Sequence, residues 1–139
     1  MSVGNKIIIY TDGGARGNPG PAGAGAVIID GERTFEFKKY LGDHQTNNWA
    51  EYEAVFLALE EAKRRGMAGR DIEIRMDSKL VVEQVSGNWK IKEPTLKPQA
   101  AKVRAALADF GSHKFVYVPR AQNAEADRLV NDAIDDAVV

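Results

Sequence analysis

The sequence predicts an α/β fold built on a five-stranded mixed sheet with helices on both faces. Three observations lead to this prediction. Strand-like apolar runs dominate roughly the first forty residues, the apolar period changes to about 3.6 residues after residue 50, and strand and helix patterns then alternate. The predicted order of elements is βββαβααβα.

The first three elements are strands. Residues 7–11 and 24–29 are apolar runs typical of buried strands, and residues 34–38 alternate with period two. An Asp30-Gly31 turn separates the last two runs, which favours an antiparallel hairpin.

A helix and a fourth strand follow. The helix is indicated by apolar residues spaced for one helical face, and Gly66 is placed to end it. The residues on that face are Tyr52, Val55, Phe56, Leu59 and Ala62. Residues 72–76 are again typical of a strand.

Two more helices are expected before the fifth strand. Residues 78–85 form a short helix that stops near Gly87. A second apolar stripe runs from Leu96 to Phe110 and is ended by Gly111.

Strand 115–118 and helix 124–138 complete the predicted order. The pattern contains no repeat and no linker, and 139 residues with 44% hydrophobic content suffice for one core. We therefore expect a single domain over residues 1–139.

Composition excludes several classes of protein. No apolar run approaches the roughly eighteen residues of a membrane span, and residues 1–6 lack the blocks of a signal peptide. The absence of cysteine excludes a disulfide framework, a thiolate nucleophile and a cysteine zinc site. We expect a cytoplasmic protein that does not contact membranes, with a monomer as the default state.

The net charge of −1, from 19 basic and 20 acidic residues, bears on nucleic-acid binding. A protein that grips nucleic acid by charge alone is usually strongly basic. Binding by this chain would have to be local, or bridged by metal ions that reverse the sign of an acidic site.

Four acids stand where predicted elements meet. Asp12 ends the first strand and opens into the glycine-rich residues 13–21, while Glu51, Asp77 and Asp127 lie at three later junctions. Carboxylates at strand ends are exposed at the edge of a sheet, and neighbouring glycines let another backbone approach closely.

Each acid also has a structural interpretation. Glu51 could be the N3 residue of a capping box with Asn48 as the cap, and Asp77 could cap the next helix together with Ser78. Asp127 would favour the macrodipole of the last helix, and Asp12 could be a turn residue. Taken singly, the structural interpretation is favoured for Glu51, Asp77 and Asp127.

Taken together, the acids favour a metal site. Two carboxylates about 4 Å apart repel by roughly 4 kcal/mol at an effective dielectric near 20, so a cluster of them requires cations. Oxygen ligands without Cys or His favour Mg²⁺ or Mn²⁺ over zinc. Two such ions can clamp the attacking and leaving oxygens of a phosphodiester, which indicates phosphodiester hydrolysis.

Competing motifs are weak. The glycine-rich segment has no Gly-Lys-Ser/Thr, so it is not a P-loop, and Gly23-Ala24-Gly25 lacks the third glycine of a dinucleotide fingerprint. His44 and His113 are isolated in the sequence, and no Ser/His/Asp triad is evident.

Five blocks in order along the chain resemble ribonuclease H type 1. They are Tyr-Thr-Asp-Gly-Gly at 10–14, Gly-Asn-Pro-Gly-Pro-Ala-Gly at 17–23, Thr-Asn-Asn-Trp-Ala-Glu at 46–51, Asp-Ser at 77–78 and Asn-Ala-Glu-Ala-Asp at 123–127. The resemblance implies the ribonuclease H fold, with three antiparallel strands followed by parallel additions. It also implies hydrolysis of the RNA strand in RNA/DNA hybrids, leaving 5′-phosphate and 3′-hydroxyl ends.

The resemblance further implies two Mg²⁺ ions, with Mn²⁺ as a substitute, bound by Asp12, Glu51, Asp77 and Asp127, with Asp12 bridging both. Small residues and amides would reach the 2′-hydroxyls in the minor groove of the hybrid. The implied substrate contacts are Gly13, Gly14, Asn18, Thr46, Asn47, Asn48, Ser78, Lys79, Arg120 and Asn123.

The sequence departs from many family members in the loop before the last acid. Residues 118–123 contain no histidine, and Arg120 or Asn123 is expected to take its role. The Pro-Arg-x-x-Asn-x-x-Ala-Asp pattern follows an archaeal-type branch of the family, some members of which also cut RNA/RNA duplexes. Double-stranded RNA is therefore a second expected substrate, and a nuclease acting mainly on such duplexes is an alternative function.

Another departure is the loss of the basic helix that some relatives use to hold the hybrid. Trp89, Lys90, Lys92 and Lys97 remain as candidate contacts to the DNA strand, and a solvated loop with one packed aromatic is the alternative. Trp49 stands where some relatives have arginine and Lys79 where many have an amide, so hybrid affinity is expected to be modest and salt-sensitive. An inactive hybrid-binding module is the remaining alternative, and the presence of all four acids argues against it.

Overall fold

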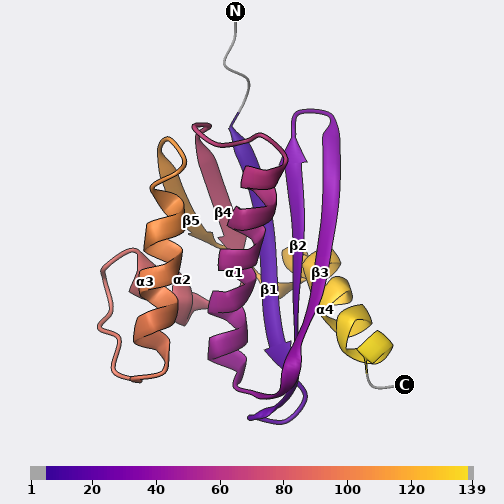
Figure 1. Ribbon diagram of the computed structural model, residues 1–139. Helices are drawn as coiled ribbons and strands as arrows, with labels where there is room; N and C mark the ends of the chain where they lie inside the picture. The colour runs from indigo at the N-terminus through magenta and orange to yellow at the C-terminus, as the bar shows by residue number, and fades with distance from the viewer. Residues whose placement is uncertain (1–5, 138–139) are drawn as a thin grey trace, which may run out of the picture.

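The computed structural model describes residues 6–137, which form one five-stranded sheet with helices on both faces (Figure 1). Residues 1–5 and the predicted end of the last helix at residue 138 lie outside the described residues. The strand order across the sheet is β3-β2-β1-β4-β5. Antiparallel pairing joins β1 to β2 and β2 to β3, whereas β1–β4 and β4–β5 are parallel. The predicted mixed sheet and the predicted order βββαβααβα are confirmed.

The three antiparallel strands are longer than the apolar runs predicted. They are β1 (Ile7–Ala15), β2 (Gly20–Asp30) and β3 (Arg33–Gln45). Glycine and alanine carry little strand signal in a sequence, yet Gly13 and Gly14 pair with Ala24 and Gly23 in the ladder. Asp12 therefore lies inside β1, so both the predicted strand end and the interpretation as a turn residue are wrong.

The hairpin between β2 and β3 is confirmed, with a shift in its turn. Asp30 pairs with Arg33, which leaves Gly31 and Glu32 as the loop residues. Gly31 has a φ of 63°, a backbone conformation that glycine adopts without steric cost.

Strand β4 (Ile72–Met76) follows helix α1 (Asn47–Arg64) in the chain. Helices α2 (Lys79–Val85) and α3 (Leu96–Leu107) come after it. Gly66 and Gly87 follow α1 and α2 with φ of 83° each, consistent with their predicted role as helix stops. Helix α3 ends before Phe110. This residue lies in the turn that follows and is nevertheless buried, with 8% of its surface exposed. The predicted stop at Gly111 is therefore several residues late.

The end of the described chain comprises β5 (His113–Tyr117), a 3₁₀ turn at Arg120–Asn123 and α4 (Ala124–Ala137). Figure 1 shows α1 and α3 on one face of the sheet and α4 on the other. Within residues 6–137, no helix combines the length and apolar character needed to cross a bilayer.

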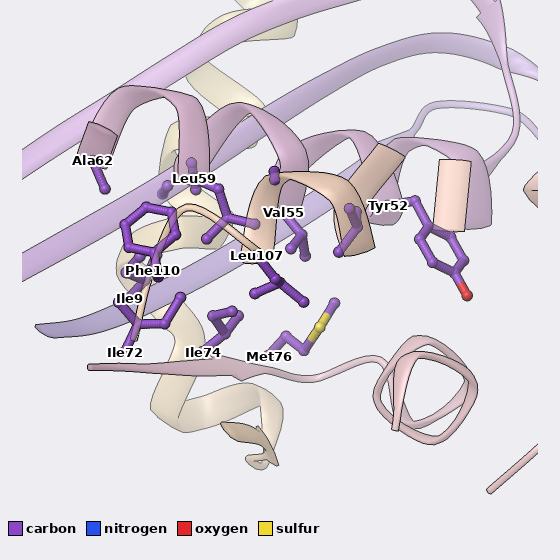
Figure 2. Close-up of a cluster of buried hydrophobic side chains, with 14 of the residues drawn as sticks. Ile9, Tyr52, Val55, Leu59, Ala62, Ile72, Ile74, Met76, Leu107 and Phe110 are labelled. Atoms are coloured by element: carbon purple, nitrogen blue, oxygen red, sulfur yellow. The ribbon is translucent and has the colours of Figure 1, made fainter. Parts of the chain in front are cut away.

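The main core lies between the sheet and the α1 face. Figure 2 shows side chains of α1, such as Val55 and Leu59, packed toward Ile72, Ile74 and Met76. The helical stripe predicted for α1 is buried except for Phe56, which is partly buried against this core. Because both α1 and the central strands are fixed by this core, side chains at their ends are held by rigid elements.

Candidate active site

Three acids from separate elements meet at one edge of the sheet. Asp12 lies on β1, Asp77 directly follows β4, and Glu51 lies in the second turn of α1. Strands β1 and β4 are parallel neighbours, so residues near their carboxyl ends are adjacent. One carboxylate oxygen from each of the three acids lies within 4.8 Å of the other two.

Gly13 allows the strand and helix to approach closely enough for this cluster. A Cβ at this position would lie 2.1 Å from the carbonyl oxygen of Ala50, so only glycine fits without displacing α1. The Gly13 N–H also donates to Glu51 Oε1 at 3.2 Å. The residue after Asp12 thus fixes the carboxylate of Glu51 beside it.

Asp127 enters the same site from the opposite face of the sheet. It lies in the first turn of α4 and lines a groove of about 500 Å³ with the other three acids. Asp127 is not part of the 4.8 Å cluster among the described residues. Arg120 Nη2 lies 3.8 Å from Asp127 Oδ1, with the arginine side chain 81% exposed at the groove.

The protein environment disfavours ionisation of two of these acids. The pKa of Asp12 is raised to about 8, first by burial and then by the charges of Asp77 and Asp127. The pKa of Glu51 is raised well above its usual range, again first by burial and then by Asp12 and Asp77. The charge of Arg120 opposes this rise in the pKa of Asp12 without cancelling it, so the gathered carboxylates still favour the binding of protons or cations.

The donor set fits a hard divalent cation. Asp12, Glu51 and Asp77 offer only carboxylate oxygens, which are the ligands of Mg²⁺ and Mn²⁺, and the chain has no cysteine. The raised pKa values mark carboxylates that a cation would stabilise in the charged form. Asp127 lies close enough to affect Asp12 and could complete the ligand set.

Among the predicted substrate contacts, Gly13, Gly14, Asn47 and Arg120 line the groove with the acids. Asn47 is held by two hydrogen bonds to the glycine-rich hairpin. Its Oδ1 accepts from the Ala15 N–H at 2.8 Å, and its own N–H donates to Asn18 Oδ1 at 3.0 Å. These bonds join the β1–β2 hairpin to the start of α1.

Thr46 is the N-cap of α1. Its Oγ1 accepts a hydrogen bond from the Trp49 N–H at 3.2 Å, and its backbone is extended. The capping-box interpretation of Glu51 is therefore wrong, because Asn48 is already inside the helix and Glu51 lies beyond position N3.

Ser78 is the N-cap of α2, with its Oγ accepting from the Val81 N–H at 3.3 Å. The cap is thus Ser78, one residue after Asp77, and the carboxylate of Asp77 belongs to the acid cluster instead. The ammonium of Lys79 lies 5.9 Å from the centroid of the Tyr117 ring, and Tyr117 lines the groove.

Asn123 is buried, contrary to its expected place among the substrate contacts. It is 1% exposed, and its Nδ2 donates to the Thr11 carbonyl at 2.8 Å. The bond joins the residue before α4 to the residue before Asp12. Asn123 therefore supports the backbone that carries Asp12 rather than contacting substrate. Between the two residues expected to replace the loop histidine, only Arg120 reaches the groove.

A second groove, of about 560 Å³, contains the other predicted contacts. Asn48, Trp89, Lys90 and Lys92 line it together with buried or partly buried residues of α2 and α3. Trp89 is 44% exposed, so the alternative of a packed aromatic describes it only in part. Lys97 is exposed and is not among the residues lining this groove.

Sequence reasoning did not predict Arg16, Tyr117 or Asn131, which also line the first groove. Arg16 lines it and donates to Asp135 Oδ1 at 2.6 Å and to Asn131 Oδ1 at 3.1 Å. Asn131 lies one helical turn after Asp127, a spacing that could have indicated it. Arg16 is the basic residue within the glycine-rich segment, which was a further available signal.

Comparison with known proteins agrees with this geometry. A family model described as reverse transcriptase-like matches residues 10–133. Ribonuclease HI of Halobacterium salinarum is 43% identical over 136 residues, which are 96% of this chain and 67% of that protein. A bifunctional protein of Mycobacterium tuberculosis is 44% identical over 95% of this chain, but the chain spans only 36% of that protein.

A solved structure supports the same assignment at the level of the fold. LC11-RNase H1, whose crystal structure was determined in complex with an RNA/DNA hybrid, is 50% identical to this chain with a TM-score of 0.90. The match covers 96% of this chain and 100% of that chain. The chain therefore belongs to the ribonuclease H type 1 family.

Proposed function

We propose that this chain is a metal-dependent endoribonuclease that hydrolyses the RNA strand of RNA/DNA hybrids, leaving 5′-phosphate and 3′-hydroxyl ends. The observation that carries the proposal is the cluster of Asp12, Glu51 and Asp77 within 4.8 Å, beside Asp127 in the same groove. The family assignment supports it, as do a relative named ribonuclease HI and a solved relative in complex with an RNA/DNA hybrid. A single domain over residues 1–139 remains part of the proposal.

In this proposal the four acids hold two Mg²⁺ ions, with Mn²⁺ as a substitute. Bound divalent ions would activate a water molecule and neutralise charge that develops on the scissile phosphate. The chain's own contribution is to hold Asp12 and Asp77 on adjacent strands and Glu51 against Gly13, so that the oxygens need little rearrangement. Arg120, at the rim, is placed to attract the phosphate backbone toward the groove.

The substrate would be recognised by shape more than by net charge. Gly13, Gly14 and Asn47 line the first groove, where their backbone and the Asn47 side chain would meet 2′-hydroxyls of an A-like duplex. Asn48, Trp89, Lys90 and Lys92 would take the DNA strand in the second groove. A monomer in the cytoplasm stays the expected state, resting on the composition alone.

A panel of matched duplexes tests the proposal. One labelled sequence is offered as RNA/DNA, RNA/RNA and DNA/DNA, each with Mg²⁺, Mn²⁺ or EDTA. We expect cleavage of the RNA strand in the hybrid that requires a divalent ion, and its loss in Asp77→Asn. Arg120 in place of a loop histidine favours some cleavage of RNA/RNA as well, which the same panel measures. Binding of the hybrid with no cleavage under any condition would support the inactive module instead.

A further inference from the structure

A buried glutamine in α2 connects the helix of Glu51 to the loop that carries Trp89. Gln84 is 4% exposed although it is polar and lies on a seven-residue helix. Its Oε1 accepts a hydrogen bond from the Tyr52 hydroxyl at 2.7 Å, and its Nε2 donates to the Lys90 carbonyl at 3.4 Å. One side chain therefore joins α1, α2 and the segment that follows α2.

The end of this connection in α1 is Tyr52, which is held in place by burial. It directly follows Glu51, and its side chain is fully buried. Figure 2 shows its hydroxyl at the end of the hydrophobic cluster, pointing away from the aliphatic side chains. A buried hydroxyl needs a partner, and Gln84 supplies it.

The segment 86–95 between α2 and α3 has no regular secondary structure. Its start is held by the N–H groups of Asn88 and Trp89, which donate to the Glu83 carbonyl at 2.9 and 3.1 Å. Ile91 packs partly against the core, while Lys90 and Lys92 on either side of it are exposed. The Gln84 bond reaches the backbone at Lys90, in the middle of the exposed stretch.

Gln84 also lines the second groove, to which several elements contribute. Asn48 of α1 lines it together with Trp89, Lys90 and Lys92 of the segment after α2. The connection from Tyr52 through Gln84 to Lys90 joins the same two parts of the chain, α1 and the segment after α2. Its length therefore sets how far the loop stands from α1.

We propose that Gln84 is a positioning residue that holds the loop 88–92 at a fixed distance from α1 and thereby sets the affinity for the nucleic acid. The identity of the ligand as an RNA/DNA hybrid rests on the proposed function, whereas the positioning of the loop does not. Gln84 has no direct role in phosphodiester cleavage in this inference. Losing it should raise KM and leave kcat almost unchanged.

Gln84→Leu and Tyr52→Phe test the connection. Gln84→Leu removes both hydrogen bonds at similar side-chain volume, and Tyr52→Phe removes only the one to Oε1. We expect KM for the hybrid to rise about fivefold in Gln84→Leu and about twofold in Tyr52→Phe. Rises of this size are what the loss of neutral hydrogen bonds produces. We expect kcat to stay within about twofold of wild type. A fall in kcat with unchanged KM would overturn the inference.

A matched control separates positioning from loss of stability. Val103 is fully buried in α3 and is not among the residues lining the groove, so Val103→Ala should lower the melting temperature without moving the loop. We expect no rise of KM in this control. An equal rise in Val103→Ala and Gln84→Leu would show that KM follows stability and would overturn the inference.

The path of the effect is tested by combining variants. If Gln84 acts through the loop, Gln84→Leu should raise KM little further once Trp89→Ala and Lys92→Ala have removed the loop side chains. Fully additive effects would contradict this path.

Amide hydrogen exchange tests the positioning without any substrate. We expect faster exchange at residues 88–92 in Gln84→Leu than in wild type, and no such change in Val103→Ala. Unchanged exchange at these residues would overturn the inference even if the protein cleaves hybrids. Faster exchange in a protein that does not bind the hybrid would sustain the positioning role and reject the proposed ligand.

Discussion

At the scale of single residues, Asp12 is under two opposed requirements. It is 7% exposed and close to three other acids, so its charged form is disfavoured in the folded chain. The same proximity is what a pair of divalent ions would need. An acid of this kind lowers the stability of the protein without metal and contributes to function when metal is bound.

The first prediction is that Asp12→Asn abolishes cleavage and stabilises the metal-free fold. At pH 9 in EDTA we expect a gain of roughly 1–3 kcal/mol, because one of several crowded charges is removed. This corresponds to an increase in melting temperature of about 3–10 °C. Thermal melts with and without EDTA, together with hybrid cleavage in Mg²⁺, measure both effects. Turnover within tenfold of wild type would remove Asp12 from its assigned role.

The second prediction concerns pH. Because the pKa of Asp12 is about 8 in the folded chain and the ordinary pKa of an aspartate is 3.8, the folded state keeps a proton that the unfolded state releases. The stabilisation is complete below about pH 4 and is lost as pH rises toward 8, so stability without metal should fall over this range. Urea unfolding from pH 4 to 9 in EDTA measures this contribution as the difference between wild type and Asp12→Asn. A difference that does not change with pH would contradict the crowded site.

At the scale of elements, the site depends on how closely β1 and α1 pack. The ladder between β1 and β2 continues through Gly13 and Gly14, so the pairing of β1 is regular where the acids meet. The two glycines differ sharply in their surroundings. A Cβ at Gly13 would overlap the backbone of Ala50, whereas the nearest atom to a Cβ at Gly14 would be Val130 Cγ1 at 3.8 Å.

The third prediction uses this difference. Gly13→Ala should destabilise the fold by about 3 kcal/mol, because the added methyl group must push α1 away from β1. Gly14→Ala is the matched control for stability, with an expected change below about 1 kcal/mol because its Cβ makes an ordinary contact. Chemical denaturation measures both variants. Equal stabilities of the two variants would show that α1 shifts freely.

The fourth prediction concerns the cap of α1. Thr46→Ala should cost about 1 kcal/mol, because the Trp49 N–H loses its partner, and Thr46→Ser should restore most of it. The expected contact of Thr46 with substrate is tested by KM in the same two variants. If Thr46→Ser restores stability but not KM, the threonine acts on the substrate as well as on the helix.

At the scale of the whole molecule, charge and shape point to different modes of binding. The net charge is −1, yet basic side chains line both grooves: Arg16 and Arg120 line the first, and Lys90 and Lys92 line the second. Arg16 is already paired with Asp135. The acids of the first groove would be neutralised by the ions that they hold in the proposed function. Binding of a duplex would thus involve few phosphate contacts by side chains.

The fifth prediction is that hybrid binding is sensitive to salt, with a slope set by only a few phosphate contacts. With about 2–3 phosphate contacts, affinity for the hybrid should fall roughly 10–50-fold between 50 and 200 mM salt, far less than the 10³–10⁵ expected for 6–10 contacts. Fluorescence anisotropy with a labelled hybrid measures it, with Ca²⁺ added in place of Mg²⁺ to suppress cleavage. Lys92→Ala should remove one phosphate contact and so lower the magnitude of the slope of log affinity against log salt concentration by about one. A slope typical of strongly basic binders would mean that other cations contact the duplex.

The order of elements and the four acids could be predicted from the sequence, because both rest on local information. Apolar periodicity reports which face of an element is buried, and the blocks around Asp12, Glu51, Asp77 and Asp127 are contiguous in the chain. The stops at Gly66 and Gly87 are local too, since they depend on the conformation of one residue.

Only the tertiary structure decided what joins elements distant in the chain. Strand β1 runs on through glycines because β2 pairs with it, and Asn123 is buried because Thr11, 112 positions away, needs a donor at its carbonyl. In the sequence, Gln84 is likewise an ordinary polar residue of a predicted helix. Only the structure shows its hydrogen bonds to Tyr52 and Lys90. Periodicity within a segment carries no information about such partners, because their positions depend on packing between elements.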